Sequence, residues 1–194
     1  MEKIMSRVVL RALILLCVLA PTAALAHPGH GGSSLTDGLV HPITGLDHVL
    51  AMVAVGLLSA QLGGRAVWLT PLTFLGVLAV GGALGMAGIN LPFAETGIVL
   101  SVIVLGLAVA LSLSLPTLGA MALVGLFAVF HGYAHGAEMP GGALGLPYAA
   151  GFLTTTALLI GVGVGLGLLT SRRAVQVAGG AMAALGVAIL SGVI

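Results

Sequence analysis

Two histidines and an aspartate lie close together in the segment His41-Pro42-Ile43-Thr44-Gly45-Leu46-Asp47-His48. Imidazole nitrogens and carboxylate oxygens are ligands of divalent transition metals. If a helix begins here with His41 at its cap, His48 lies two turns further along nearly the same face, and Met52 follows as a soft ligand. Asp47 then points about 120° away, where it could hold an imidazole in place or reach a neighbouring helix. Alternatively, His41 and Asp47 only cap and orient the start of the helix.

A second pair of histidines lies in the segment Phe130-His131-Gly132-Tyr133-Ala134-His135-Gly136-Ala137-Glu138. His131 and His135 are four residues apart and share one face of a helix. Glu138 joins them if the helix continues. Two imidazoles one turn apart beside a carboxylate suit nickel, cobalt or zinc. The alternative is a pair of interfacial histidines whose polar tips only reach towards water.

Glu95 and two N-terminal histidines are further candidates for binding a metal or a proton. Glu95 lies near the start of another apolar segment, where a carboxylate either complements the helix dipole or adds a ligand. Ser101, further along that segment, is a lesser candidate. His27 and His30 could capture a metal together with a free amino group if the chain is cleaved before His27. The alternative for these two histidines is a solvated tail.

The composition indicates the kind of fold that must position these residues. Of 194 residues, 59% are hydrophobic and only 6% are charged, whereas a soluble domain has about 25% charged residues. These values exclude a soluble globular enzyme and a disordered chain. The formal net charge is +1 with no basic cluster, so no nucleic-acid partner is expected, and no nucleotide-binding motif occurs. The sequence therefore predicts an integral membrane protein whose surroundings are a lipid bilayer.

The first residues have the features of a secretory signal peptide. A basic stretch precedes an apolar run at 12–20, and small residues follow up to Ala26. This run is short for a spanning helix, which needs about 20 residues. Cys17, the single cysteine, falls in the segment that would be removed, so neither a disulfide nor a thiolate metal site is expected. The expected divisions are a signal peptide at 1–26, a periplasmic tail at 27–38 and a transmembrane transport domain at 39–194.

Six apolar runs predict an all-α integral membrane protein with six transmembrane helices. Each run is close to the length of about 20 residues that crosses a bilayer, and glycine, proline or arginine residues separate the runs. Glycines in the fifth run also predict close helix packing; they are Gly161, Gly163, Gly165 and Gly167. The expected helices cover 39–62, 66–87, 93–115, 117–135, 148–170 and 174–193.

The charged residues are divided between the two expected sides of the membrane. If the cleaved N-terminus is periplasmic, Arg65 and the pair Arg172-Arg173 fall on inner connections, as the positive-inside rule requires. The carboxylates after residue 26 and all six histidines fall towards the outer side. Both histidine segments then lie at the same depth, and the C-terminus is also periplasmic. This pattern predicts a multi-pass protein of the bacterial inner membrane.

The two histidine segments resemble the signature motifs of the HupE/UreJ family of bacterial nickel permeases, some of whose relatives are linked to cobalt. The resemblance rests on residues 41–52 and 130–138, and the sequence Pro-Phe-Ala-Glu-Thr-Gly-Ile at 92–98 also fits. It extends over nearly the whole chain after the signal segment. The functional positions that it implies are His41, Asp47, His48, His131, His135 and Glu138.

Together these features predict a secondary transporter, not an enzyme, that takes up Ni²⁺ from the periplasm. Its metal site would lie near the outer side of the first and fourth spans. Co²⁺ or Zn²⁺ are alternative ions. A membrane-embedded metalloenzyme with a His/carboxylate centre is an alternative function, and so is a sensor or chaperone that binds metal without flux. The sequence leaves open the driving force and the oligomeric state, a homo-oligomer included.

Overall fold

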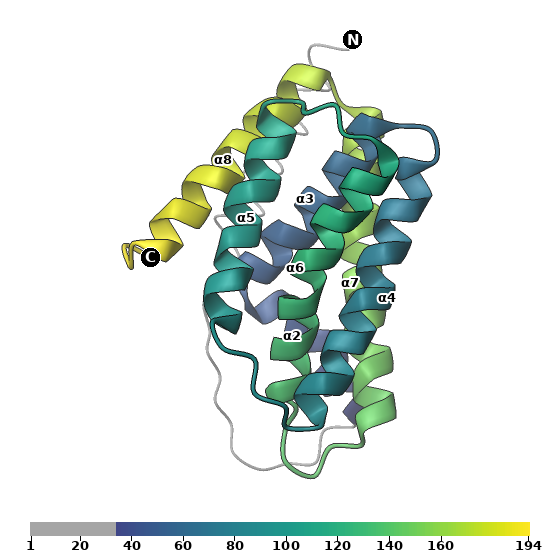
Figure 1. Ribbon diagram of the computed structural model, residues 1–194, viewed down its shortest axis with the longest axis vertical. Helices are drawn as coiled ribbons and strands as arrows, with labels where there is room; N and C mark the ends of the chain where they lie inside the picture. Colours follow the sequence, from purple (N-terminus) through teal and green to yellow (C-terminus); the bar gives the residue numbers. More distant parts are fainter. Residues whose placement is uncertain (1–33) are drawn as a thin grey trace.

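The computed structural model describes residues 34–194, so the expected signal peptide, His27 and His30 lie outside the described residues. This part of the chain forms seven helices and contains no strand. The helices make an elongated bundle, with α8 and α5 on one side and α4, α6 and α7 on the other (Figure 1). They are α2 (Ser34–Thr44), α3 (Leu46–Leu62), α4 (Ala66–Met86), α5 (Ala94–Ala110), α6 (Thr117–Ala137), α7 (Gly145–Leu169) and α8 (Arg172–Leu190).

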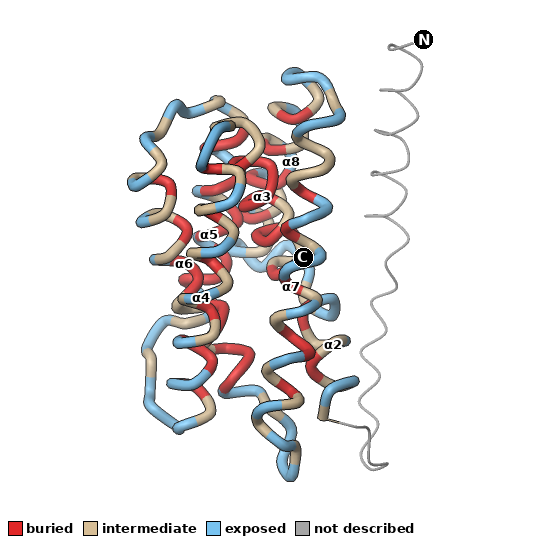
Figure 2. The backbone as a smooth tube through the Cα atoms, turned by 90° about the vertical axis from the view of Figure 1, so that its right-hand side faces the viewer, coloured by how far each residue is buried: buried red, intermediate tan, exposed pale blue. Residues whose placement is uncertain are grey.

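Helix α3 is the centre of the bundle. It contacts each of the other described helices, and its buried residues dominate the interior (Figure 2). After its first turn α3 carries no charged residue, so every face can be buried against apolar neighbours. A helix that touches all others is well placed to connect a site at one end of the bundle with events at the other.

The lengths and surfaces of the helices are those of a multi-pass membrane protein. Helices α4, α6, α7 and α8 are long and apolar enough to cross a membrane. Helices α3 and α5 have 17 residues each, or about 26 Å, which is near the shortest length of about 17 residues for a span. Large apolar side chains such as Trp68, Leu118 and Leu158 face outwards, as expected in lipid.

The first expected span, 39–62, is not one continuous helix. It consists of α2 and α3, which meet at an angle of 82° around Gly45, whose backbone is extended (φ −98°, ψ 120°). The prediction that His41 caps a new helix before Pro42 is therefore wrong, because both residues lie in the last turns of α2. Thr44 ends that helix by donating its hydroxyl to the His41 carbonyl (2.7 Å).

The third expected span, 93–115, is also shorter than predicted. Helix α5 ends at Ala110, and the following apolar residues form a turn in which Ser112 has a positive φ of 48°. Leucines on both sides of this turn hide it from a hydropathy pattern. The boundaries of the remaining helices differ from expectation by only a few residues.

Glycines bring α4 and α6 into backbone contact. A Cβ atom on Gly132 would collide with the Leu78 carbonyl, and one on Gly136 would collide with the Gly82 carbonyl. Small residues one turn apart allow this close approach between helices in membranes. The contact fixes the rotation of α6 and therefore the direction of its histidines.

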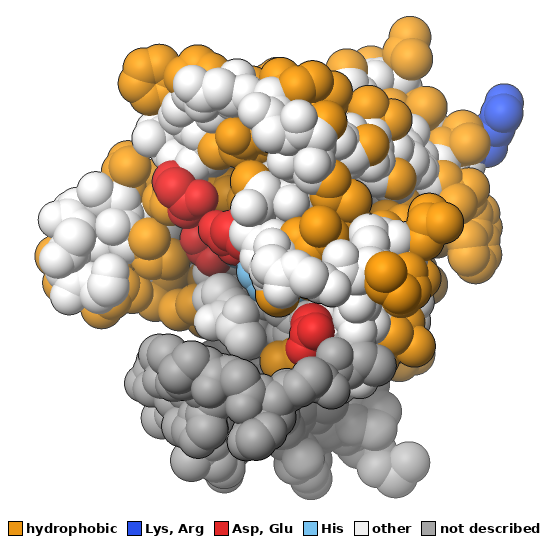
Figure 3. Space-filling view, turned by 90° about the horizontal axis from the view of Figure 1, so that it is seen from below, with side chains coloured by type: hydrophobic (Ala, Val, Ile, Leu, Met, Phe, Trp, Pro, Cys, Tyr) orange, Lys and Arg blue, Asp and Glu red, His pale blue; other side chains and the backbone are white. Residues whose placement is uncertain are grey.

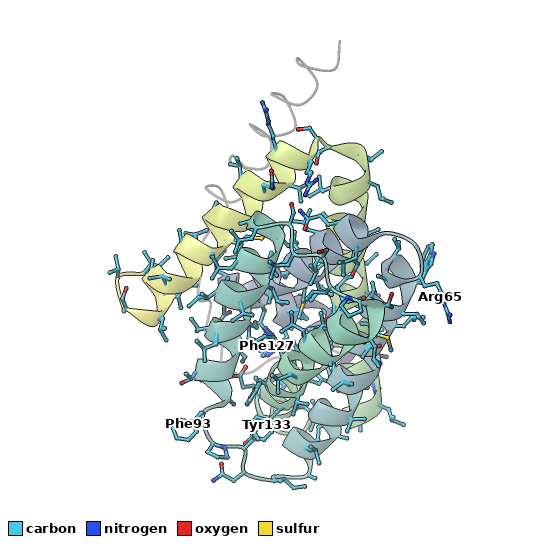
Figure 4. All side chains as sticks on the ribbon, turned by 45° about the horizontal axis from the view of Figure 1, so that its top comes forward. Arg65, Phe93, Phe127 and Tyr133 are labelled. Atoms are coloured by element: carbon cyan, nitrogen blue, oxygen red, sulfur yellow. The ribbon has the colours of Figure 1, made fainter. Side chains whose placement is uncertain are left out.

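The bundle has two chemically different ends. At one end, α4 connects to α5 and α6 connects to α7 (Figure 1). We call it the carboxylate end, because Asp47 at the start of α3, Glu95 at the start of α5 and Glu138 just after α6 lie on this side. The arginine end, where α3 connects to α4 and α7 connects to α8, carries Arg65 and Arg172-Arg173. Arg65 points away from the bundle, at the end opposite Phe93 and Tyr133 (Figure 4). Within residues 34–194, the arginines thus lie at the opposite end of the bundle from Asp47, Glu95 and Glu138, as the sequence predicts.

Candidate functional site

Four imidazole rings meet inside the carboxylate end of the bundle. His135 of α6 lies between His41 of α2 and His48 of α3, with ring centroids 4.9 and 4.8 Å away. His48 in turn lies 5.0 Å from His131, one turn deeper on α6. His131 and His135 are fully buried, and His48 is 9% exposed. The rings therefore form a continuous row from the partly exposed His41 to the interior; we call it the imidazole row.

The bend at Gly45 makes this arrangement possible. It turns α2 away from the axis of α3 and onto the first half of α7, where Thr155 of α7 donates its hydroxyl to the Leu39 carbonyl (2.7 Å). A Cβ atom at Gly45 would lie only 2.8 Å from both Asp47 Oδ1 and His48 Nδ1. His41 and His48 therefore do not share a helical face as expected, and each instead contacts His135 of α6.

Asp47 fixes the orientation of His48. Its Oδ1 atom accepts hydrogen bonds from the His48 backbone N–H and from the ring Nδ1, both at 2.8 Å. Because a carboxylate only accepts, the ring proton lies on Nδ1 and the lone pair on Nε2. That Nε2 is buried and has no hydrogen-bond partner among the described residues. Of the two roles expected for Asp47, the structure shows the one in which it holds an imidazole.

Ser101 of α5 has the same relation to His131. The Ser101 hydroxyl donates to the Ile98 carbonyl (2.6 Å) and lies 2.8 Å from His131 Nε2. Since its one hydrogen is used, Ser101 accepts from Nε2–H, which leaves the lone pair of His131 on Nδ1. This Nδ1 is buried without a partner in the described part of the chain. Sequence reasoning ranked Ser101 low because nothing in its surroundings reveals that it faces α6.

Glu138 pairs with His41 and does not extend the His131–His135 face as predicted. Helix α6 ends at Ala137, and Glu138 is the residue that follows it. Its Oε2 lies 3.0 Å from His41 Nε2. The hydrogen bond from His41 lowers the pKa of the Glu138 carboxyl below its ordinary value, although partial burial opposes this. The carboxylate is therefore ionised over the whole neutral range.

His135 is the least satisfied group of the row. Both of its ring nitrogens are buried and have no partner among residues 34–194. Each unsatisfied buried polar atom costs about 1–3 kcal/mol, so such atoms usually mark a ligand site or an ordered water. The interior thus offers lone pairs on three consecutive imidazoles.

Aromatic side chains pack against the sides of the imidazole row. The Phe152 ring stacks on His135 at 5.2 Å, and the rings of Tyr148 and Phe74 lie 6.0 Å from His41 and His131, respectively. Nothing in the sequence pattern distinguishes these three residues, since apolar and aromatic residues are expected everywhere in a membrane helix. They keep the imidazoles in a dry, shaped environment, in which polar interactions are stronger.

Carboxylates surround the outer opening of the imidazole row. Viewed from the carboxylate end, acidic side chains gather around a depression in which a histidine is visible (Figure 3). Glu95, in the first turn of α5, is exposed and close enough to Glu138 and Asp47 for their charges to act on it. This cluster can attract a cation towards the buried rings.

The described conformation does not present a ready-made chelate. No group of three His, Cys, Asp or Glu side chains within residues 34–194 is placed to hold one metal ion. The rings instead pack edge to face, so ring rotation must precede coordination by more than one of them. Met52 is fully buried in the apolar core one turn beyond His48, and its role as a ligand remains a prediction.

Apolar helices around buried, unpartnered imidazoles, with carboxylates at one opening, define a multi-pass membrane protein with an internal polar site. A family model described as HupE / UreJ protein matches residues 15–189. The chain is also 48% identical over 176 residues to Protein HupE of Rhizobium leguminosarum bv. viciae, covering 89% of this chain and 92% of that protein. No solved structure matches. The chain therefore belongs to the HupE/UreJ family, whose members are transporters and not enzymes.

Proposed function

We propose that this protein is a secondary transporter that takes up Ni²⁺ from the periplasm through the imidazole row. The observation that carries the proposal is the set of buried imidazole nitrogens without partners on His48, His131 and His135. Such nitrogens cost stability unless a ligand uses them, and the carboxylates at the opening favour a cation. Membership in a family associated with nickel and cobalt supports a metal ion as that ligand.

The geometry suggests how the ion would move. The carboxylates of Glu95 and Glu138 attract the hydrated cation. The His41 ring then separates from Glu138, so that the Glu138 carboxylate can receive the ion. The ion then exchanges waters for imidazole nitrogens of His135, His48 and His131 in turn. The absence of a three-ligand group among the described residues suits this role, because a transport site must bind weakly enough to release its ion. Ligation also requires neutral imidazoles, so protons compete with the metal.

The same proposal includes a topology for the chain. Residues 1–26 are a cleaved signal peptide, and His27 and His30 first capture metal on the periplasmic tail proposed at 27–38, whose last five residues begin α2. The α2–α3 pair, bent at Gly45, and helices α4 to α8 are the six passes across the inner membrane. The carboxylate end and the C-terminus face the periplasm, and the arginine end faces the cytoplasm, in accordance with the positive-inside rule.

Nickel is proposed over cobalt on the basis of ligand chemistry. Imidazole and carboxylate ligands suit both ions, but a given site of this kind usually binds Ni²⁺ more tightly than Co²⁺. The test is flux into proteoliposomes that contain the purified protein and an enclosed metal-sensitive dye. Ni²⁺ should enter faster than Co²⁺ and much faster than in protein-free liposomes. Binding without flux would instead identify a sensor or chaperone.

Ser101→Ala should lower nickel flux by about tenfold, the loss that follows removal of a group that orients a metal-binding histidine. The alanine no longer accepts from His131 Nε2–H, so the ring is no longer held in the orientation that leaves its lone pair on Nδ1. Ser101→Thr keeps the hydroxyl and should restore most of the flux. Flux is measured in proteoliposomes at equal amounts of folded protein.

Ser59→Ala is a matched control for this prediction. Ser59 is also a fully buried helical serine, and its hydroxyl also donates to a backbone carbonyl, that of Val55 (2.6 Å). It has no hydrogen bond to an imidazole in the described structure. Equal loss of flux in Ser101→Ala and Ser59→Ala would mean that Ser101 only stabilises the fold.

Glu138→Gln should lower nickel flux at limiting metal by about threefold through loss of attraction for the cation. His41 holds the pKa of Glu138 below its ordinary value. The carboxylate therefore keeps its full negative charge throughout the neutral range and loses it only at a pH below the ordinary pKa of a glutamate. The ratio of wild-type to variant flux should therefore stay constant between about pH 5.5 and 7.5. A ratio that approaches one towards pH 5.5 would contradict this assignment.

A further inference from the structure

A second polar site lies at the arginine end of the bundle. A cavity of about 480 Å³ opens there between the ends of α3, α5 and α7 and the start of α8. Its polar lining comes from Gln61, Ser112, Ser114, Thr170 and Arg172. Gln61 lies 13 residues after His48 on the same helix α3, which is about 20 Å along the helix axis. One helix thus carries a polar site at each end.

Hydroxyl groups and one amide line this cavity beside Arg172, and we call it the exit cavity. Gln61 Nε2 donates to the Val109 carbonyl (3.0 Å) and to Ser112 Oγ (3.3 Å), while its Oε1 is buried without a partner among the described residues. Thr170 donates its hydroxyl to the Leu166 carbonyl (2.7 Å), so its oxygen can accept. Hydroxyl oxygens that line the cavity, such as that of Thr170, can receive hydrogen bonds from the waters around a cation.

The size of the exit cavity fits a hydrated cation. One water occupies about 30 Å³, so a shell of six waters around a divalent ion needs roughly 200 Å³, less than half of the cavity. Arg172 also lines it and donates from Nε to Ser112 Oγ (3.4 Å). The Arg172 guanidinium already opposes tight binding of a dication, so a hydrated ion is held only weakly there and a further positive charge would exclude it.

An apolar layer separates the exit cavity from the imidazole row. Val55 and Leu58 of α3 and Leu105 of α5 are fully buried between the two sites and belong to the hydrophobic core. Helices α3 and α5 must therefore shift relative to each other before an ion can pass. The hydrogen bonds from Gln61 to Val109 and Ser112 join these two helices at the cavity.

We infer that the exit cavity is the release site of the transport path for a hydrated divalent cation. The hydrogen bonds of the Gln61 side chain hold α3 and α5 together at this site and must break when the helices shift. This inference rests on the proposed uptake of nickel. It predicts that a positive charge placed in the cavity slows transport without weakening capture at the carboxylate end.

The test attaches a charge after the protein has folded. In a Cys17→Ser background, Ser114→Cys places the single thiol in the exit cavity, and Ser171→Cys places it on the same end outside the cavity lining; both positions are exposed. Each purified protein is labelled with a cationic or an anionic thiosulfonate of similar size and reconstituted. Nickel flux and the equilibrium affinity for nickel are measured.

The cationic label at position 114 should reduce nickel flux by about tenfold, while the anionic label reduces it less. Nickel affinity should stay within about twofold, and labels at position 171 should change flux by no more than that. If nickel flux is the same before and after labelling at position 114, or if labels at position 171 inhibit equally, the inference about the exit cavity is overturned while the proposed function stands. If the unlabelled parent shows no nickel flux, the proposed function fails and the inference falls with it.

Discussion

Replacing His131 with alanine should reduce nickel flux by at least about tenfold, since even the loss of groups that orient metal ligands has effects of 10–100-fold. His131 is the deepest member of the imidazole row, and its Nδ1 faces the interior without a described partner. An ion that has passed His48 therefore has no further imidazole ahead of it in this variant. His48→Ala should have an effect of similar size, because His48 contacts both His131 and His135.

The control for these variants must separate lost ligation from lost packing. His131→Ala leaves a cavity beside Phe74, and cavities in a packed interior destabilise proteins by about 2–5 kcal/mol. His131→Phe fills the space but supplies no nitrogen, so it should be folded and as inactive as the alanine variant. Nickel flux at the wild-type level in a folded His131→Phe protein would exclude His131 from the path.

Gly85→Leu should prevent the bundle from assembling. A Cβ atom at Gly85 would collide with the Tyr133 carbonyl and lie 2.6 Å from the Ala137 backbone nitrogen. Overpacking usually costs about 1–3 kcal/mol where side chains can yield, but here the obstacles are backbone atoms of α6. We expect several-fold less folded protein in detergent and a lower melting temperature.

Gly76→Leu is the matched control on the same helix. Gly76 is exposed, and a Cβ atom there meets no other atom within 4 Å. Its side chain would face lipid, where leucine is favourable. Yield and melting temperature should stay close to those of the wild type. A similar loss in Gly76→Leu would mean that α4 does not tolerate leucine in general and that the glycine contact is not the cause.

Local patterns in the sequence were sufficient to locate most of the helices but did not predict the bend between α2 and α3. Apolar runs of span length located most helices to within a few residues, since their lengths are imposed by the membrane. Gly45 lies in an apolar run, and glycine is common within membrane helices. Its extended backbone depends on the packing of α2 against α7, which no local pattern records.

The glycines of α7 illustrate the same limit. All four were expected to pack closely, but only Gly163 and Gly167 do so, against Val53 and Ala60 of α3, respectively. Gly161 and Gly165 meet nothing within 4 Å. Residues two apart point to different faces of a helix, and the sequence does not say which face meets a neighbour.

The residue types of the candidate site could be predicted from the sequence, but not which side chains pair with each other. Histidines and carboxylates are costly inside a membrane, so their presence alone marked both segments. The partner of each imidazole lies elsewhere in the fold or in an unexpected direction. Glu138 reaches His41 from another helix, and Ser101 reaches His131. These pairings decide which ring nitrogens are free, and they follow only from the packing of the helices.

The most direct test of the central claim is the position of nickel bound to the purified protein, determined by anomalous diffraction at the nickel edge. We predict a peak within bonding distance, about 2.0–2.1 Å for imidazole nitrogen, of nitrogens of the imidazole row, with His135 or His48 among the ligands. The peak should be lost in a folded variant that lacks both histidines. Nickel bound only at exposed carboxylates, with the imidazole row still packed edge to face, would contradict the account.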